Sequence, residues 1–240
     1  MARKGWKAAL AVMVCLTLMS GTALAGLVDE VAVGIRWKKF ELTGDKGFTG
    51  TITSNSVDEK TEIYPTNLNA LVTFCPYGGL VFEYDRFGAV MERDGRLFWD
   101  TFMLGVNVRH HFKEYRLAPY AMVGVTWSRV RFDENNWWRY GYGSVQEFDE
   151  YSKGRPPEDW MTATRRLRNM QPDDCFGWAF GCGVDVFLTE HIALNLDVKW
   201  NRAETDVNYR TRIDDHNEID RDFTYDLNTV SYGLGVRWYF

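Results

Sequence analysis

The chain has 240 residues, with 28 basic and 33 acidic side chains and a formal net charge of −5. This length is enough for one domain, and the acidic balance argues against nucleic acid as a partner. After residue 25 there is no run of about 18 uncharged apolar residues, so the sequence predicts no membrane-spanning helix in that region. Strands of membrane barrels escape this test, because they alternate apolar and polar residues.

Residues 1–25 have the pattern of a cleaved secretory signal peptide. Three basic residues precede residue 8, and an apolar run without charge then extends from Ala8 to Met19. Residues 23–25, Ala-Leu-Ala, form a small-x-small cleavage site. The alternative, an N-terminal membrane helix, is disfavoured because spanning a bilayer takes about 20 residues. Cleavage would leave residues 26–240 as one domain, which contains 25 basic and 33 acidic side chains.

Apolar and polar residues then alternate in eight segments, as they do in strands with two different faces. The first four are predicted at about 28–40, at 64–75, from 80 to the mid-80s, and at 97–112. In the fourth, Phe102 and Leu104 lie on one face, and Thr101 and Gly105 lie on the other. The other four lie between 118 and 133, at 175–188, from 192 to about 201, and at the C-terminus.

The connections between these segments alternate between long and short. Polar stretches predicted as loops occupy about 41–63, 87–96, 133–173 and 204–223, whereas residues 76–79, 113–118 and 189–191 predict tight connections. An up-and-down membrane barrel has this rhythm, with short periplasmic turns and longer extracellular loops.

The chain ends in a strand whose apolar face carries aromatic residues near the C-terminus and whose opposite face carries small or polar residues. Gly233 and Gly235 lie on this second face. This strand, the signal peptide, the eight segments and the loop rhythm together resemble the small eight-stranded outer-membrane barrels of Gram-negative bacteria, such as the OmpA membrane domain, OmpX and OmpW. The resemblance implies an all-β, eight-stranded antiparallel transmembrane barrel after a cleaved signal peptide, with outer-membrane lipid and lipopolysaccharide as partners. It also implies an assembly signal read by the barrel-assembly machinery: Tyr232, Gly233, Leu234, Val236, Trp238 and Phe240.

The polar faces are expected to point into the barrel, because an eight-stranded interior could not hold aromatic side chains from every strand. A soluble sandwich or lipocalin-like barrel is the alternative. The inferred lumen contains nine charged residues: Arg36, Lys38, Glu83, Asp85, Arg109, Asp185, Asp197, Lys199 and Arg237. Buried charges are costly unless paired, so we expect these residues to form ion pairs that plug the lumen. A polar conduit for a small solute is the alternative.

Two groups of aromatic residues are expected outside the lumen. Trp37, Trp127, Trp200, Trp238 and Tyr239 are predicted to form the girdle at the membrane interface. The longest loop, 133–173, carries candidate contact residues for a surface ligand: Trp137, Trp138, Tyr140, Tyr142 and Trp160. The alternative for this loop is a hairpin that extends two strands and packs its aromatic residues across them.

The sequence contains no motif that identifies an enzyme or a metal site. No serine lies close to His216, and the acidic run from Asp214 to Asp222 lacks the central glycine of a calcium loop. We therefore predict no catalytic residue, no metal and no cofactor. The cysteines of the mature chain, Cys75, Cys175 and Cys182, are expected to be unpaired.

The leading functional hypothesis is a non-enzymatic outer-membrane protein with a plugged lumen and external loops available to a surface or to lipopolysaccharide. The alternative, which the OmpW-like resemblance implies, is a narrow channel or lateral transporter for small apolar solutes. Leu71, Met103 and Met122 would line part of its pocket. A lipid A-modifying enzyme is a third and less favoured hypothesis.

Overall fold

The computed structural model describes residues 28–43, 57–58, 65–91, 95–133, 168–212 and 218–240. These residues form eleven strands and one short 3₁₀ helix, η1. The strands are β1 (Glu30–Leu42), β2 (Val57–Asp58), β3 (Pro65–Cys75), β4 (Gly78–Met91), β5 (Gly95–Arg109), β6 (Leu117–Asp133), β7 (Arg168–Pro172), β8 (Cys175–Phe187), β9 (Ile192–Arg212), β10 (Glu218–Asp226) and β11 (Thr229–Tyr239). Within this described part, no helix is long and apolar enough to cross a bilayer.

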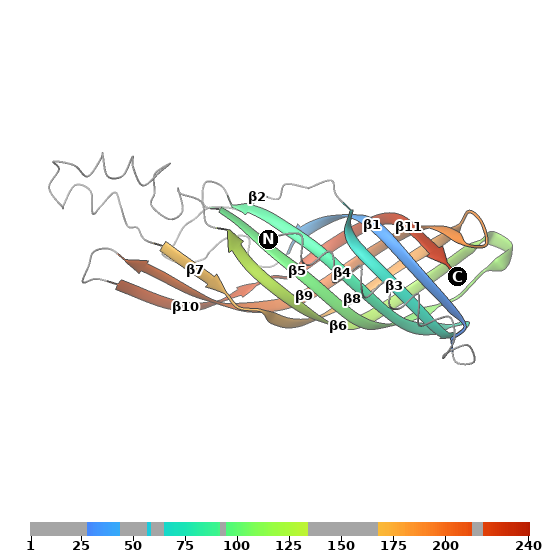
Figure 1. The fold of residues 1–240 in the computed structure, drawn as a ribbon, viewed down its shortest axis with the longest axis horizontal. Coiled ribbons are helices and arrows are strands. Elements are labelled where there is room, and N and C mark those ends of the chain that lie inside the picture. Colours follow the sequence, from blue (N-terminus) through green and yellow to red (C-terminus); the bar gives the residue numbers. More distant parts are fainter. Residues whose placement is uncertain (1–27, 44–56, 59–64, 92–94, 134–167, 213–217) are drawn as a thin grey trace.

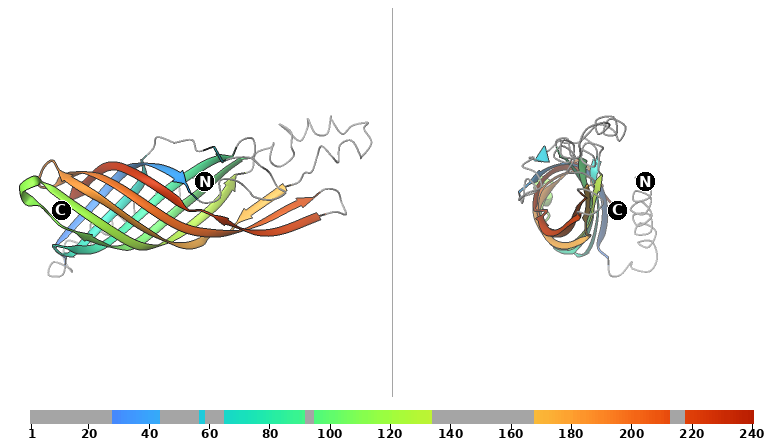
Figure 2. Two further views of the ribbon diagram at one scale, coloured as in Figure 1. Left: turned by 180° about the vertical axis from the view of Figure 1, so that it is seen from behind. Right: turned by 90° about the vertical axis from the view of Figure 1, so that its left-hand side faces the viewer.

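Eight of the strands close into a single antiparallel barrel (Figure 1). Around the ring the order is β1, β3, β4, β5, β6, β8, β9 and β11. The last strand returns to the first, in a ladder that runs from Ala32↔Tyr239 to Leu42↔Thr229. Seen end-on in Figure 2, the strands form a ring. Each of the eight described barrel strands therefore has a hydrogen-bonded neighbour on both sides, which confirms the predicted fold class.

The two ends of the barrel differ. At one end, called the turn end below, β3 and β4 are joined by residues 76–77, β5 and β6 by a link containing η1 (Lys113–Tyr115), and β8 and β9 by residues 188–191. β1 begins and β11 ends there (Figure 1). The opposite end, the loop end, receives the longer connections. Most predicted strand boundaries lie within two or three residues of the observed ones.

The segment 204–223 corrects the loop prediction, because most of it is strand. β9 runs on to Arg212 and pairs with β10 from Glu204↔Asp226 to Arg212↔Glu218, and β7 pairs with the same part of β9 on its other side. Polar side chains join the strands: Asn208 Nδ2 donates to Asp222 Oδ1 at 2.9 Å. Polarity alone does not imply a loop, because cross-strand polar pairs stabilise a solvated hairpin.

The loop predicted at 87–96 is also too long. The β4–β5 ladder continues to Met91↔Gly95, so only 92–94 lie between the two strands. Within the loop predicted at 41–63, Val57–Asp58 forms β2, which pairs with the end of β4. Within 133–173, residues 168–172 form β7. The signal peptide at 1–25 and residues 134–167 lie outside the described residues.

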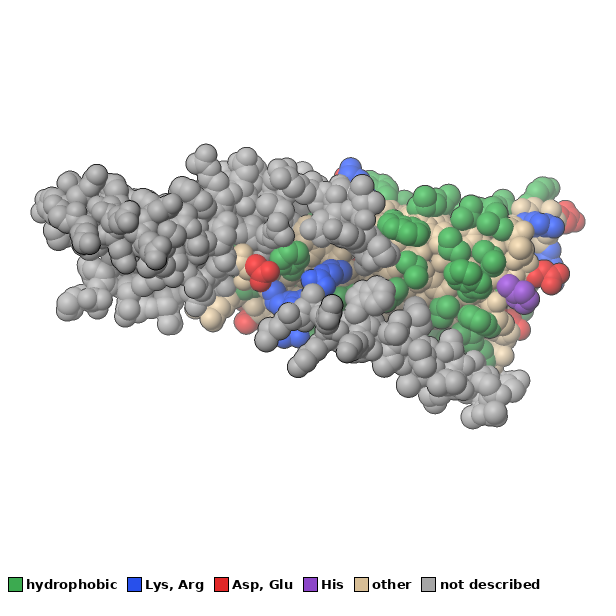
Figure 3. All heavy atoms as spheres, turned by 45° about the horizontal axis from the view of Figure 1, so that its top comes forward, with side chains coloured by type: hydrophobic (Ala, Val, Ile, Leu, Met, Phe, Trp, Pro, Cys, Tyr) green, Lys and Arg blue, Asp and Glu red, His purple; other side chains and the backbone are tan. Residues whose placement is uncertain are grey.

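The outer surface of the barrel is apolar along its middle. Figure 3 shows a band of hydrophobic side chains over the barrel strands. Large apolar side chains that are more than a third exposed occur on successive outward positions, among them Phe102, Leu104, Val106, Val108, Val123, Val125, Trp178, Phe180, Leu194, Leu196, Leu234 and Trp238. A soluble protein would bury such side chains, so this surface suits contact with lipid.

Candidate functional site

Where long charged side chains cross the lumen, neighbouring inward positions are glycines. On β11, a Cβ atom added at Gly233 would overlap the Asp197 carboxylate, and one added at Gly235 would overlap the backbone oxygen of Ile35. The glycines therefore leave room for side chains from the neighbouring strands. A small, polar inward set opposite a bulky outward set was the basis of the predicted orientation.

All nine charged residues predicted to face the lumen lie inside it, and each is at most 5% exposed. They form two groups at different depths. The first is called the central network here and consists of Arg36 and Lys38 on β1, Glu83 and Asp85 on β4, and Asp197 and Lys199 on β9.

Each cation of the central network contacts at least two carboxylates. Arg36 donates to both Glu83 and Asp197. Lys199 Nζ lies 2.8 Å from Glu83 Oε2 and also contacts Asp85. Lys38 Nζ lies 3.2 Å from Asp85 Oδ1 and 3.5 Å from Asp197 Oδ2. Three cations and three carboxylates thus link three strands across the lumen, and their formal charges cancel.

The second group lies nearer the turn end and mixes charged with neutral polar side chains. Asp185 accepts from Arg237 Nη1 at 2.6 Å, from Asn195 Nδ2 at 2.6 Å and from the Tyr239 hydroxyl. Arg237 Nε also donates to Asn69 Oδ1 at 3.1 Å. Asn69 in turn donates to Asn67, which donates to Asp85, so hydrogen bonds connect this group to the central network.

Glu30 is a lumen residue that the sequence reasoning missed. Its Oε2 lies 3.2 Å from Arg109 Nη1, and it supplies the fifth carboxylate for the five lumen cations. The parity of β1 could have identified it, because Glu30 alternates in step with Arg36 and Lys38.

Tyr239 corrects the girdle prediction. It is 2% exposed and points into the lumen, whereas Trp238 beside it is 48% exposed. Alternation requires this, since Trp238 and Phe240 already take the outward positions. Trp37, Trp127 and Trp200 lie on the outer surface, as do the large side chains of the predicted assembly signal, Tyr232, Leu234, Trp238 and Phe240.

Apolar side chains line the lumen between the central network and the loop end. This loop-end apolar cluster consists of Phe87, Leu97, Trp99, Val130, Cys175, Ala203, Val207, Tyr225 and Leu227, with Phe40 and Phe132 packed against it. Its rings are close: the centroid of Phe87 lies 4.2 Å from that of Trp99 and 4.9 Å from that of Phe40. In register, the row Phe87, Trp99 and Val130 comes directly after the row Asp85, Thr101 and Ser128.

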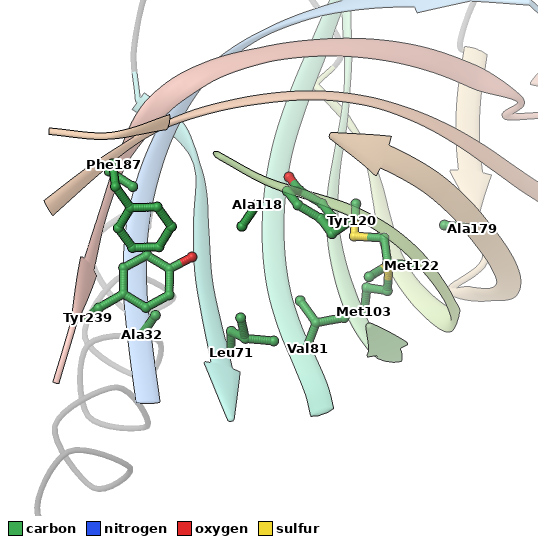
Figure 4. Packing of buried hydrophobic residues seen from close by; sticks show 11 residues of the cluster. Ala32, Leu71, Val81, Met103, Ala118, Tyr120, Met122, Ala179, Phe187 and Tyr239 are labelled. Atoms are coloured by element: carbon green, nitrogen blue, oxygen red, sulfur yellow. The ribbon is translucent and has the colours of Figure 1, made fainter. Parts of the chain in front are cut away.

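Leu71, Met103 and Met122 also face the lumen, but at a different depth from the loop-end cluster. They belong to a second apolar cluster, which extends toward the turn end and includes Tyr120, Phe187 and Tyr239. In Figure 4, Met103 lies beside Met122, and the Phe187 ring lies against that of Tyr239, with centroids 4.9 Å apart. These three residues therefore pack beside the polar groups and do not line the loop end.

The other titratable side chains and the thiols are dispersed. His111 at the turn end stacks on Phe187, and burial together with the positive charge of Arg109 lowers the pKa of its imidazole. Cys75, Cys175 and Cys182 are free thiols. In the described part of the chain, no three His, Cys, Asp or Glu side chains are grouped to hold a metal ion. His216 and the loop candidates Trp137, Trp138, Tyr140, Tyr142 and Trp160 lie outside the described residues.

A closed antiparallel barrel with apolar side chains outside and paired charges inside has the fold of a small outer-membrane β-barrel. No protein-family model and no curated protein matches the chain. Solved structures do. The outer membrane protein OprG from Pseudomonas aeruginosa is similar with a TM-score of 0.61 and 15% identity, over 90% of this chain and 98% of OprG. The outer membrane protein AlkL, solved in lipid bilayers, is similar with a TM-score of 0.52 and 15% identity, over 88% of this chain and 90% of AlkL.

Proposed function

We propose that this protein is a non-enzymatic barrel of the Gram-negative outer membrane that admits small apolar molecules at its loop end while its lumen stays closed to ions. The loop end faces the cell exterior. The observation that carries the proposal is the order of the layers along the lumen: apolar side chains lie nearest the loop end, and the central network lies directly below them.

The central network supports closure to ions. An eight-stranded barrel has an interior just wide enough for side chains to fill. A hydrated ion passing straight through would have to separate Arg36 or Lys199 from buried carboxylates. Breaking one partner of such a pair leaves an uncompensated charge in a poorly hydrated space, which costs several kcal/mol, on the order of 3–5.

The loop-end apolar cluster supports an apolar cargo. Inward positions of membrane barrels that carry water are lined by polar side chains. Here the inward positions near the loop end are occupied by the aromatic residues Phe40, Phe87 and Trp99. Hydrophobic and aromatic side chains also line most sites that bind small ligands. A polar solute would lose its hydration among these rings without gaining hydrogen bonds.

Cargo stopped by the central network would leave sideways, and the seam between β1 and β3 is the best candidate for the exit. The ladder between these strands shifts register between Arg36 and Trp37 and ends at Trp37↔Pro65, whereas β1 stays paired with β11 to Leu42. Proline offers no backbone donor, so the ladder is weakened where it ends. This position is level with the boundary between the two layers of the lumen.

Uptake of naphthalene by cells with and without the protein tests the proposal. Phe87→Asn places an amide in the loop-end cluster, and we expect a several-fold loss of protein-dependent uptake. The matched control is Phe98→Asn, because Phe98 lies on the outer side of β5 beside the same rows. Equal uptake by the two variants, with both folded as judged by a heat-dependent gel shift, would contradict an apolar route through the lumen.

A further inference from the structure

The outer face of β4, β5 and β6 changes character along the barrel in register-matched rows. Beyond the row of Gly78, Val108 and Ala121 at the turn end, the rows are numbered here from Leu80, and the first two are apolar: Leu80, Val106 and Val123, then Phe82, Leu104 and Val125. The third row is aromatic, Tyr84, Phe102 and Trp127. The fourth is charged, Arg86, Asp100 and Arg129, and Arg131 follows in the next row.

The aromatic row fixes the depth of the charged row. Tyr84, Phe102 and Trp127 are in contact, with ring centroids 5.0 and 5.5 Å apart. Aromatic side chains of this kind gather where acyl chains meet headgroups. The next outward position on each strand therefore lies at headgroup depth.

The charged row together with Arg131 in the next row contains three arginines and one carboxylate. Arg86 and Arg131 contact one carboxylate, that of Asp100, and Arg129 is the register partner of Asp100 on β6. The carboxylate accepts from Tyr84 at 2.8 Å and contacts Arg131, and Arg86 Nε lies 3.9 Å away. Asp100 thus holds the guanidinium groups in position without neutralising them.

The arginines keep donors for a ligand. The Arg86 and Arg131 side chains are 37% and 38% exposed, whereas that of Asp100 is 13% exposed. Each guanidinium has five N–H donors in a planar fork that matches the oxygens of a phosphate. Figure 3 shows that basic side chains do lie beyond the hydrophobic band toward the loop end.

We propose that Arg86, Arg129 and Arg131 bind the phosphate of a phosphorylated glycolipid in the outer leaflet, whose acyl chains lie along the apolar rows below. This rests on the membrane placement proposed above and does not involve the lumen. Charge complementarity calls for an anion, and the adjoining apolar rows favour one that carries acyl chains over free phosphate. The aromatic row then separates the phosphate from the acyl chains.

The test measures binding of lipid A to the refolded protein in detergent by native mass spectrometry. The variant Arg129→Gln/Arg131→Gln removes two cations and keeps Asp100 beside Arg86. The matched control, Lys39→Gln/Arg202→Gln, removes two outward cations elsewhere on the barrel. A heat-dependent gel shift establishes that every protein tested is folded.

We expect the first variant to bind lipid A about tenfold more weakly or worse and the control to bind within about twofold of the unchanged protein. Lipid A without phosphates should bind the unchanged protein as weakly as the variant does. Three results would overturn the proposal: no difference between the two variants, equal binding of dephosphorylated lipid A, or displacement of lipid A by millimolar inorganic phosphate. Naphthalene uptake should be the same in both variants, so failure of this site and failure of the lumen route are distinguishable.

Discussion

Arg36 illustrates how a single residue holds the lumen together. Its guanidinium bridges Glu83 on one side and Asp197 on the other, and it is completely buried. Two carboxylates from strands on either side of β1 thereby share one guanidinium, and Lys38 and Lys199 supply the rest of the positive charge. Gly235 opposite Arg36 in the β1–β11 ladder leaves the space that the Arg36 side chain uses.

Replacing Arg36 should therefore cost more than replacing a surface cation. We expect Arg36→Met to lower the free energy of unfolding by about 3 kcal/mol or more, because both carboxylates lose their shared partner in a buried site. Urea unfolding in lipid vesicles, followed by tryptophan fluorescence, measures this. Lys39→Met is the matched control, since Lys39 pairs with Glu41 on the exposed face of the same strand. Similar losses in both variants would rule out a special contribution from the central network.

Strand parity made the lumen charges predictable at this scale. Alternation placed Glu83 and Asp185 inside correctly because each lies within a clear apolar pattern. It missed Glu30 because that residue is the first of β1, where few neighbouring residues indicate which face points into the lumen. Tyr239 was misplaced for a different reason: its residue type suggested the girdle, although its parity pointed inward.

At the scale of elements, β9 has two parts with different roles. From Ile192 to Ala203 it pairs with β8 and β11 as a barrel strand, and from Glu204 to Arg212 it pairs with β10 beyond the ring. The sequence predicted the first part from its apolar alternation. It could not predict the second, because both faces of a strand outside the membrane are polar and the signal of alternation is lost.

The outer part of the β9–β10 hairpin should be dispensable for barrel folding. Replacing 208–222 by a short glycine-rich turn keeps Val207 opposite Phe223 and leaves every barrel ladder intact. We expect the shortened chain to refold with an unchanged heat-dependent gel shift. Val198→Pro is the contrasting variant, because it removes a donor in the part of β9 that has partners on both sides, and it should not fold. A shortened chain that fails to refold would show that the barrel depends on the projecting hairpin.

For the whole molecule, the sequence predicted that the strands close into a barrel, but it did not predict the height of each inward side chain along the lumen. Eight alternating segments and an alternating loop rhythm are sufficient to predict a ring, because lipid cannot satisfy an open edge. Alternation says which side chains point inward, but the height of each one in the lumen depends on how neighbouring strands are staggered. Met103 and Phe87 are both inward residues, yet Met103 is level with Glu83 and Phe87 lies on the loop-end side of Asp85. The layered lumen therefore becomes visible only when the ladders are known.

That layering predicts the electrical behaviour of the molecule. In a planar bilayer the unchanged protein should show no discrete openings, because the central network fills the lumen with paired charges. Replacing Arg36, Glu83, Asp85 and Lys199 by serine removes two cations and two anions, so the lumen stays formally neutral while large side chains give way to small ones. We expect this variant to conduct, since water can then occupy the space and hydrate a passing ion. The matched control is Phe87→Asn, which changes the loop-end cluster and leaves the network whole, and it should stay silent. Openings in the unchanged protein, or silence in a folded serine variant, would mean that the barrier to ions lies elsewhere along the lumen.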